Sequence, residues 1–419
     1  MTLDTRFTNE LIDNYLMKTT LAFISILGLI SFSSCSQQTT KSSSNGVTSV
    51  ETKEANSPEY KPAFEGQTRV KAVTTKTPYK FEVLTEDLDS PWGIAALPDG
   101  RFLITEKEGN MRIVDATGKI SEKINGLPAV NSKGQGGLLG ITLAPDFAKS
   151  RMVYFTLAED VEGGTLTAAG KGRLADNEKS IENASVIYRA GPSHNGTLHY
   201  GGRILFDKEG NLFVSTGERS DKVTRPKAQD LNSGLGKIVH ITTDGKPVAN
   251  GPFADKSRPE IYSYGHRNVQ GLAFHPVTGD LWSNEFGPRG GDEVNRVVAG
   301  NNYGWPTITY GIEYGGKKIG NVIQQKEGME QPVYYWDPSV SPSGMTFYSG
   351  SAIPEWQNNL FVGCLSGLHI ARLEIKNNKV VGEERLLVNE SQRFRDIIQS
   401  GENLYTVTDQ GKLYRISKK

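Results

Sequence analysis

The sequence predicts an all-β fold, a six-bladed β-propeller of four-stranded antiparallel blades. One pattern recurs six times after Pro78: a small residue, an apolar strand, a turn rich in Pro, Asp and Gly, and a second strand that ends in Thr, Glu or Asp. No helical periodicity separates the copies. Repeated β-units that cannot bury both faces alone stack into a ring. The second strands are expected to begin near Phe102, Met152, Leu212, Leu281, Leu360 and Leu404.

Two packed β-sandwiches are the structural alternative, because sandwiches also contain many short strands. The chain of 419 residues has a formal net charge of zero and no long basic run. It therefore lacks the electrostatic basis for binding a phosphate backbone, and no nucleic-acid partner is expected.

Residues 1–35 are expected to be a signal segment. Met17 and Lys18 precede an apolar run at 21–32, which is too short to span a bilayer. Small residues then lead to Cys35, a pattern that resembles a bacterial lipoprotein signal. Lipid on Cys35 would be the protein's one link to a membrane, and the protein would be exported to the periplasm or anchored at the outer membrane.

Residues 36–77 are rich in Ser, Thr and Lys and are expected to form a disordered linker, which leaves 78–419 as the propeller domain. Only Cys364 would remain in the mature body, so no disulfide framework is expected.

Polar residues occur at the same phase of several copies. Gln135, His199 and Arg267 lie three to five residues before a first strand, whereas Glu218 and Asp409 close second strands. Both phases mark the same end of a blade, so these side chains should converge on one rim of the central channel. His199 and Glu218 lie at the open end of one hairpin, where an antiparallel pair brings them within reach of each other.

Two further stretches suit a bound anion and a bound cation. Arg393 and Arg395 alternate onto one face of an extended segment, and arginine forks bind carboxylates. The run 285–293 is a glycine-rich loop with backbone carbonyls and three carboxylates, which is calcium chemistry. An acidic turn is the simpler interpretation of that loop taken alone.

The same segments resemble the PQQ-dependent aldose sugar dehydrogenases, relatives of soluble quinoprotein glucose dehydrogenase in the glucose/sorbosone dehydrogenase family. The resemblance runs from about Pro78 to Ile416. It is carried in order by the segments SPWGIAALPDG, GQGGLLGITLAPDF, LHYGGRILFD, YGHRNVQGLAF, EFGPRGGDEVN, NNYGWP and RFRDIIQ.

The resemblance implies roles for individual residues. His199 would be the catalytic base, with Glu218 as its partner and Arg267 beside the reacting oxygen. The PQQ cofactor would be held by Gln135, His199, Arg267, Asn268, Arg393 and Arg395. The calcium ion that binds it would take carbonyl oxygens of Gly287 and Pro288, and a second, structural calcium would be held by Asp292, Glu293 and Tyr303.

The chain differs from soluble glucose dehydrogenase at two of these positions. Glu218 replaces an aspartate, and Ser366 replaces a lysine that contacts the cofactor. The predicted function is oxidation of an aldose at the anomeric hydroxyl to the lactone, by hydride transfer to PQQ, with an external electron acceptor. A calcium-dependent propeller lactonase, or a propeller that only binds glycans or proteins, is the alternative.

Overall fold

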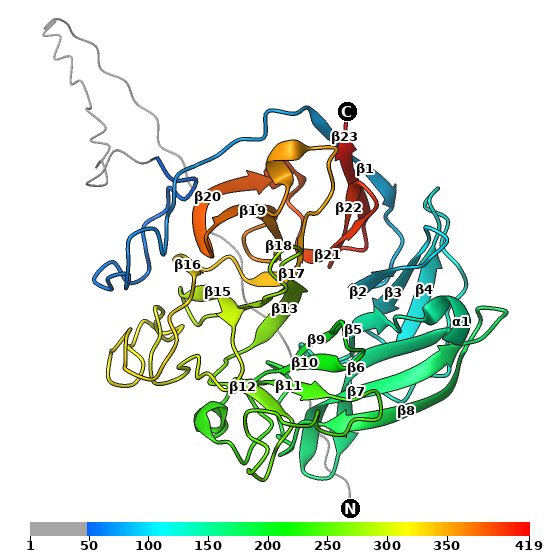
Figure 1. Ribbon diagram of the computed structural model, residues 1–419, viewed down its shortest axis with the longest axis horizontal. Helices are drawn as coiled ribbons and strands as arrows, with labels where there is room; N and C mark the ends of the chain where they lie inside the picture. The colour runs from blue at the N-terminus through cyan, green and yellow to red at the C-terminus, as the bar shows by residue number, and fades with distance from the viewer. Residues whose placement is uncertain (1–47) are drawn as a thin grey trace, which may run out of the picture. The chain divides into compact units, whose positions relative to one another are not determined.

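The computed structural model describes residues 48–419, which form six antiparallel sheets arranged in a ring (Figure 1). The predicted six-bladed propeller is confirmed. Five of the second strands begin at the expected residue, and the sixth begins at Asn403, one residue before Leu404. In blades 1 to 5 the strands follow chain order outward from the channel, and in every blade the innermost strand lies against the innermost strands of the two neighbouring blades.

The first three blades contain eleven strands. Their bounds are β2 (Pro91–Ala96), β3 (Phe102–Glu106) and β4 (Asn110–Val114) in blade 1; β5 (Leu138–Leu143), β6 (Met152–Val161), β7 (Gly164–Leu174) and β8 (Ile181–Arg189) in blade 2; β9 (Gly201–Phe206), β10 (Leu212–Thr216), β11 (Lys237–Ile241) and β12 (Ile261–Tyr264) in blade 3.

Blades 4 and 5 repeat this order, and blade 6 takes its outermost strand from the start of the propeller. Their bounds are β13 (Val269–Phe274), β14 (Leu281–Glu285), β15 (Asp292–Val297) and β16 (Tyr334–Trp336) in blade 4; β17 (Pro342–Phe347), β18 (Leu360–Cys364), β19 (His369–Lys376) and β20 (Lys379–Leu386) in blade 5; β21 (Phe394–Ser400), β22 (Asn403–Thr408), β23 (Leu413–Lys418) and β1 (Tyr79–Thr85) in blade 6. The described helices are single turns: α1 (Phe147–Ser150) and the 3₁₀ turns Arg225–Gln229, Pro354–Trp356 and Val388–Glu390.

Blade 1 departs from the predicted four strands. Its sheet has three, and residues 120–124 reach the outer edge of β4 only through isolated bridges from Ile120 to Val114 and from Ile124 to Met111. A glycine and a lysine precede Ile120, and only Ile120 and Ile124 are large apolar residues in 118–124. This segment therefore has little apolar surface with which to hold a longer strand against the blade.

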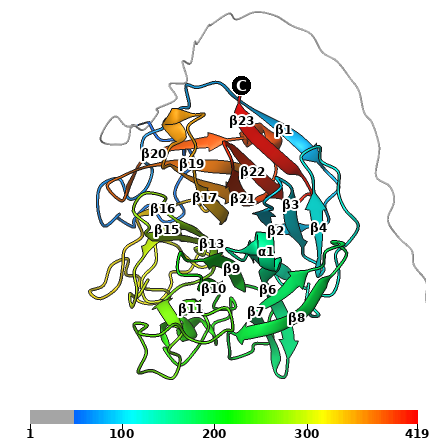
Figure 2. The ribbon, with the colours of Figure 1, turned by 45° about the vertical axis from the view of Figure 1, so that its right-hand side comes forward.

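Blade 6 closes the ring by joining the two ends of the propeller. Its outermost strand β1 comes from the start of the propeller and pairs antiparallel with the final strand β23, from Tyr79 with Lys418 to Thr85 with Leu413. The two strands run side by side in both views of the ribbon (Figures 1 and 2). A ring closed in this way leaves the first strand of the propeller with a backbone partner.

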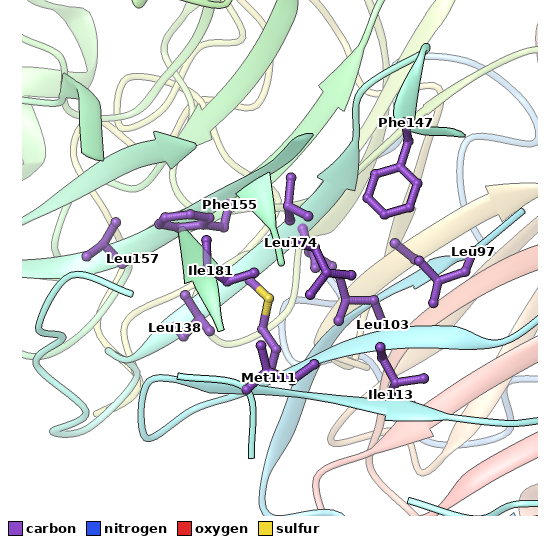
Figure 3. Packing of buried hydrophobic residues seen from close by; sticks show 14 of the residues in the cluster. Leu97, Leu103, Met111, Ile113, Leu138, Phe147, Phe155, Leu157, Leu174 and Ile181 are labelled. Atoms are coloured by element: carbon purple, nitrogen blue, oxygen red, sulfur yellow. The ribbon is translucent and has the colours of Figure 1, made fainter. Parts of the chain in front are cut away.

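The core lies between the faces of adjacent blades. Figure 3 shows the cluster between blades 1 and 2, in which Leu103 and Met111 from one sheet meet Leu138, Phe155 and Leu157 from the other, all fully enclosed. Each such side chain contributes about 1.5–3 kcal/mol through the apolar surface that it removes from water. Packing of this kind holds the channel-lining first strands in fixed positions.

The predicted linker needs a correction over the part that the structure describes, residues 48–77. Residues 71–73 pair with Glu383 on the outer edge of β20, and Gln67 is fully buried with its amide donating to the carbonyl of Pro332. The carboxylate of Asp337 accepts hydrogen bonds from the backbone of Asn56 and Ser57. Polar composition did not predict this order because the segment fills the open backbone edge of a blade and builds no core of its own.

Two sequence predictions concern residues that precede position 48. The signal segment and Cys35 lie outside the described residues. Among residues 48–419, no helix has the length and apolar character needed to cross a membrane.

Candidate active site

His199 and Glu218 form the buried hydrogen bond that the hairpin pattern predicts. Nδ1 of His199 lies 2.7 Å from Oε1 of Glu218, and both side chains are nearly inaccessible to water. A carboxylate can only accept, so the imidazole proton lies on Nδ1 and Nε2 is a free acceptor. Nε2 makes no hydrogen bond within residues 48–419, and His199 lines a cavity at the channel mouth.

The backbone around His199 is held in an unusual conformation. His199 has a φ of 48°, in the left-handed region, and is followed by Gly201 and Gly202, which also have positive φ. The amide of His199 donates to Oε1 of Gln135 at 2.8 Å, and the amide of Gly201 donates to Oδ1 of Asn268 at 2.9 Å. Two predicted cofactor ligands, Gln135 and Asn268, therefore fix the turn that carries the histidine.

The pKa of His199 follows from this enclosure. Burial lowers it to about 4, and the positive charge of Arg267 acts in the same direction, whereas the hydrogen bond to Glu218 raises it. The imidazole is therefore uncharged at neutral pH and can accept a proton at Nε2.

The cavity has a volume of about 430 Å³ and opens at the end of the blades where the polar residues converge. The predicted residues Gln135, His199, Arg393 and Arg395 line it, together with the closing residue Asp409. Asp409 accepts hydrogen bonds from Nε of both arginines, at 2.8 Å from Arg393 and 2.7 Å from Arg395. Burial alone would raise the pKa of Asp409, but the two guanidinium groups lower it below its ordinary value.

Arg267 lies beside this cavity in a narrow cleft with Gly287 and Pro288. Its Nη1 donates to the carbonyl of Gly287 at 2.5 Å and to that of Phe286 at 3.1 Å, and the guanidinium lies 5.1 Å from the ring centre of Trp305. The arginine thus contacts a carbonyl to which the sequence assigned calcium. One positive group already satisfies that oxygen.

Two of the three residues that the resemblance assigns to a second calcium have their side-chain oxygens in hydrogen bonds. Both oxygens of Asp292 accept backbone N–H groups, from Gly287, Val340 and Ser341, so this carboxylate ties the 286–291 loop to the start of blade 5. The hydroxyl of Tyr303 donates to the carbonyl of Arg296. Burial and the nearby charge of Glu285 raise the pKa of Glu293 well above its ordinary value. The resemblance alone did not show that the tyrosine hydroxyl hydrogen-bonds back to its own blade.

Blade 4 contains a second pair with the same spacing. Nδ1 of His266 lies 2.9 Å from Oε1 of Glu285, again 19 residues away. Here Nε2 is also occupied, by the hydroxyl of Ser263 at 2.9 Å, and the ring stacks on Tyr303. The pair in blade 4 is therefore closed off, whereas the pair in blade 3 presents a free nitrogen to the cavity.

A buried ion pair lies in the channel between this cavity and a second cavity at the other end. Nη1 of Arg203 lies 2.6 Å from Oδ2 of Asp396, and the guanidinium lies 4.6 Å from the ring centre of Trp92, which lines the active-site cavity. Arg203 and Asp396 line the second cavity, of about 790 Å³. This layer gives the active-site cavity a floor.

Lys107 and Tyr314 are among the cavity-lining residues that sequence reasoning missed. Lys107 directly follows Glu106, which closes a second strand. The pattern of polar residues at strand ends therefore indicated Glu106 and not Lys107. Tyr314 lies in the long loop between β15 and β16, where strand phase carries no information. Tyr314 is 68% exposed, and the residue before it, Glu313, forms an ion pair with Arg225.

The fold and the cavity define a β-propeller protein with a small-molecule site at one end of its channel. The chain belongs to the glucose/sorbosone dehydrogenase family, whose model, described as Glucose / Sorbosone dehydrogenase, matches residues 88–415.

Two curated relatives illustrate the range of this similarity. The chain is 42% identical over 347 residues to aldose sugar dehydrogenase YliI of Escherichia coli K12, a match that covers 80% of this chain and 92% of that protein. It is 24% identical over 408 residues to quinoprotein glucose dehydrogenase B of Acinetobacter calcoaceticus, which covers 78% and 85% of the two chains.

Solved structures agree with this assignment. The apo-form of the soluble aldose sugar dehydrogenase from Escherichia coli superposes with a TM-score of 0.77 at 41% identity, over 81% of this chain and all of that one. The PQQ-bound form of aldose sugar dehydrogenase from Streptomyces coelicolor has a TM-score of 0.67 at 29% identity, over 82% and 99% of the two chains.

The pKa of His199 predicts a dependence of stability on pH. The unfolded imidazole, with a pKa of 6.5, takes up a proton that the folded state excludes until about pH 4, so stability is lost as the pH falls through this window. We expect the melting temperature of the wild type to fall more steeply between pH 6.5 and 4 than that of His199→Gln. Buried His369, whose pKa burial also lowers to about 4, leaves the variant with part of the slope.

The control is His194→Gln, which changes a partly exposed histidine. Parallel melting profiles for the wild type and His199→Gln would show that the folded state does not exclude this proton.

Proposed function

We propose that the protein is a PQQ- and calcium-dependent sugar dehydrogenase that oxidises an aldose at its anomeric hydroxyl to the lactone. The observation that carries this proposal is the free Nε2 of a buried, uncharged histidine facing a cavity whose charged lining residues are mostly cations. Such a lining favours an anionic cofactor over a neutral lactone as the molecule held beneath the substrate. The relatives named above are dehydrogenases.

The residues present fit PQQ, a planar quinone with three carboxylates. Arg393 and Arg395 supply guanidinium groups from one side of the cavity, and Trp92 supplies an aromatic surface at its floor. Gln135 and Asn268 lie behind the turn of His199 and keep the base in place. When bound, PQQ supplies the quinone that accepts a hydride from the sugar.

Calcium would be held by backbone oxygens. The carbonyls of Gly287 and Pro288 lie in the cleft beside the cavity, and Arg267 now donates to the first of them. A hard cation takes such oxygen ligands and would take over this carbonyl, which frees the guanidinium of Arg267 to turn toward the cavity. There Arg267 would stabilise negative charge that develops on an oxygen of the reacting pair.

His199 takes the proton of the anomeric hydroxyl at Nε2. The imidazolium that forms is buried beside Arg267, and both conditions disfavour it. Glu218 offsets them through its hydrogen bond to Nδ1, which becomes charge-assisted once the ring is protonated. Glu218 therefore acts through His199, as the group that orients the base and stabilises its charged form.

The same proposal includes an external electron acceptor that reoxidises the cofactor, and export of the protein with lipid attached at Cys35. Sugar choice would be set at the rim of the cavity by the loop that carries Tyr314. An exposed aromatic ring offers an apolar face to the C–H groups of a sugar ring, and the ion pair of Glu313 with Arg225 holds the adjoining residue.

Substitutions of the base and of its partner should lower kcat by different amounts. His199→Gln removes the proton acceptor, so kcat should fall about 10²- to 10⁴-fold while PQQ still binds. Glu218→Gln keeps the shape but removes the charge, so the loss should be smaller and the pH optimum should move. Steady-state rates of dye reduction across pH measure both effects. A His199→Gln enzyme with near wild-type rate and full cofactor occupancy would rule out the base.

Metal dependence tests the function as a whole. Purified apo-protein should reduce dye with an aldose only after PQQ and Ca²⁺ are both added, because the cation binds cofactor oxygens and neutralises their charge. Chelation should abolish activity and re-addition of Ca²⁺ should restore it. Full activity of extensively chelated protein with PQQ alone would contradict the role of calcium, and no activity under any condition would contradict the dehydrogenase.

Tyr314→Ala should weaken sugar binding. Loss of one stacking face costs about 1 kcal/mol, so KM for aldoses should rise about fivefold with kcat little changed. Tyr314→Phe keeps the ring and should behave as the wild type. Val223→Ala serves as a control for an exposed apolar side chain that does not line the cavity. An unchanged KM in Tyr314→Ala would exclude the rim ring from sugar binding.

A further inference from the structure

The active-site cavity has an excess of positive charge that its own residues do not balance. Three cations line it, Lys107, Arg393 and Arg395, against one lining carboxylate, Asp409. Asp409 accepts hydrogen bonds from both arginines, and those guanidinium groups keep its pKa low. Glu218 is committed to His199 and does not line the cavity. Lys107 is therefore the lining cation with no carboxylate of its own.

The position of Lys107 is defined by its surroundings. Its backbone N–H donates to the carbonyl of Ser90, and its carbonyl accepts from the amide of Leu138. The stem of the side chain passes Gly137 so closely that a Cβ there would lie 2.5 Å from Cγ. The ammonium group donates to the carbonyl of Gly134 at 2.8 Å, and within residues 48–419 no carboxylate lies within 4 Å of it.

That single hydrogen bond leaves most of the ammonium group available. Lys-NH₃⁺ has three donors, of which Gly134 takes one. Gly134 directly precedes Gln135, whose side chain accepts from the backbone of His199. The ammonium is thus held on the Gln135 side of the cavity, next to the turn that carries the base.

Lys107 and the arginine pair come from adjacent blades. Blade 6 supplies Arg393 and Arg395, and blades 1 and 5 are its two neighbours. Blade 1 presents Lys107 just after its second strand. Blade 5 presents Ser366 at nearly the same phase, where the hydroxyl bonds to that of Ser341 at 2.7 Å and offers no charge.

We propose that Lys107 binds a carboxylate of the quinone cofactor, so that the anion is held between the cations of blades 6 and 1. This inference rests on the proposed function and concerns the same site. An ammonium with two free donors forms a charge-assisted hydrogen bond to a carboxylate, and the aqueous cavity weakens but does not abolish it. Gly137 leaves space for the aliphatic part of this side chain, and the carbonyl of Gly134 accepts a hydrogen bond from its ammonium group.

The test is the equilibrium affinity of apo-protein for PQQ at saturating Ca²⁺, measured by dialysis and the absorbance of the free cofactor. Lys107→Met should raise Kd about tenfold and make Kd less sensitive to salt, because one charge contact is lost. Lys107→Arg should stay within about threefold of the wild type. Lys171→Met is the matched control, since Lys171 pairs with Asp244 and does not line the cavity, and its Kd should not change.

A reciprocal variant tests charge against structure. In Lys107→Met/Ser366→Lys a cation returns from the other neighbour of blade 6, so part of the lost affinity should be recovered. Lys107→Gln replaces Lys107→Met if the latter does not fold, and it should show the same loss. Recovery of PQQ affinity in the double variant supports an electrostatic role. If Lys107 were merely structural, a new lysine at position 366 would not restore the affinity.

The outcomes separate the two proposals. Wild-type protein that binds PQQ, with Lys107→Met and Lys107→Gln binding equally well, would overturn the role of Lys107 alone. A fall in kcat for Lys107→Met with no change in Kd would also overturn it. Wild-type protein that binds no PQQ would overturn the proposed function, and this inference with it.

Discussion

The hydrogen bond between His199 and Glu218 is the contact on which the site depends. It fixes the tautomer, so that the free nitrogen faces the cavity. It also raises the pKa of His199, against the burial that lowers this pKa. The strained turn at His199 persists only because Gln135 and Asn268, from two neighbouring blades, hold the backbone on either side. Loss of register in either blade would therefore misplace the base without touching it.

The fold could be predicted because its repeats carry a regular signal. A small residue, a strand, a turn and a second strand recur in the same order. This repeat predicts where five second strands begin, at Phe102, Met152, Leu212, Leu281 and Leu360. Features that arise from pairing between distant segments had no such signal. The order of residues 48–77 and the union of β1 with β23 depend on which backbone edges remain open after the blades form.

The site was predicted where function coincides with strand phase. His199, Gln135, Arg393 and Arg395 lie at strand starts, and the structure brings them to one cavity. Lys107 and Tyr314 lie outside that phase and were missed. Tyr303 was assigned to calcium by the family resemblance, and its hydroxyl hydrogen-bonds to the carbonyl of Arg296. Side-chain direction after a loop is decided by local partners that a linear pattern does not contain.

Closure of the ring by its own ends imposes an order on biosynthesis. More than 300 residues separate β1 from β23, so at the usual pace of translation, roughly 5–20 residues per second, the first strand waits well over ten seconds for its partner. Throughout that interval β1 has an unpaired edge, and blade 6 cannot form. The six residues of the final strand thus decide whether the chain closes into a ring. A protein truncated before Leu413 would keep all of the named site residues, but β1 would have no partner strand.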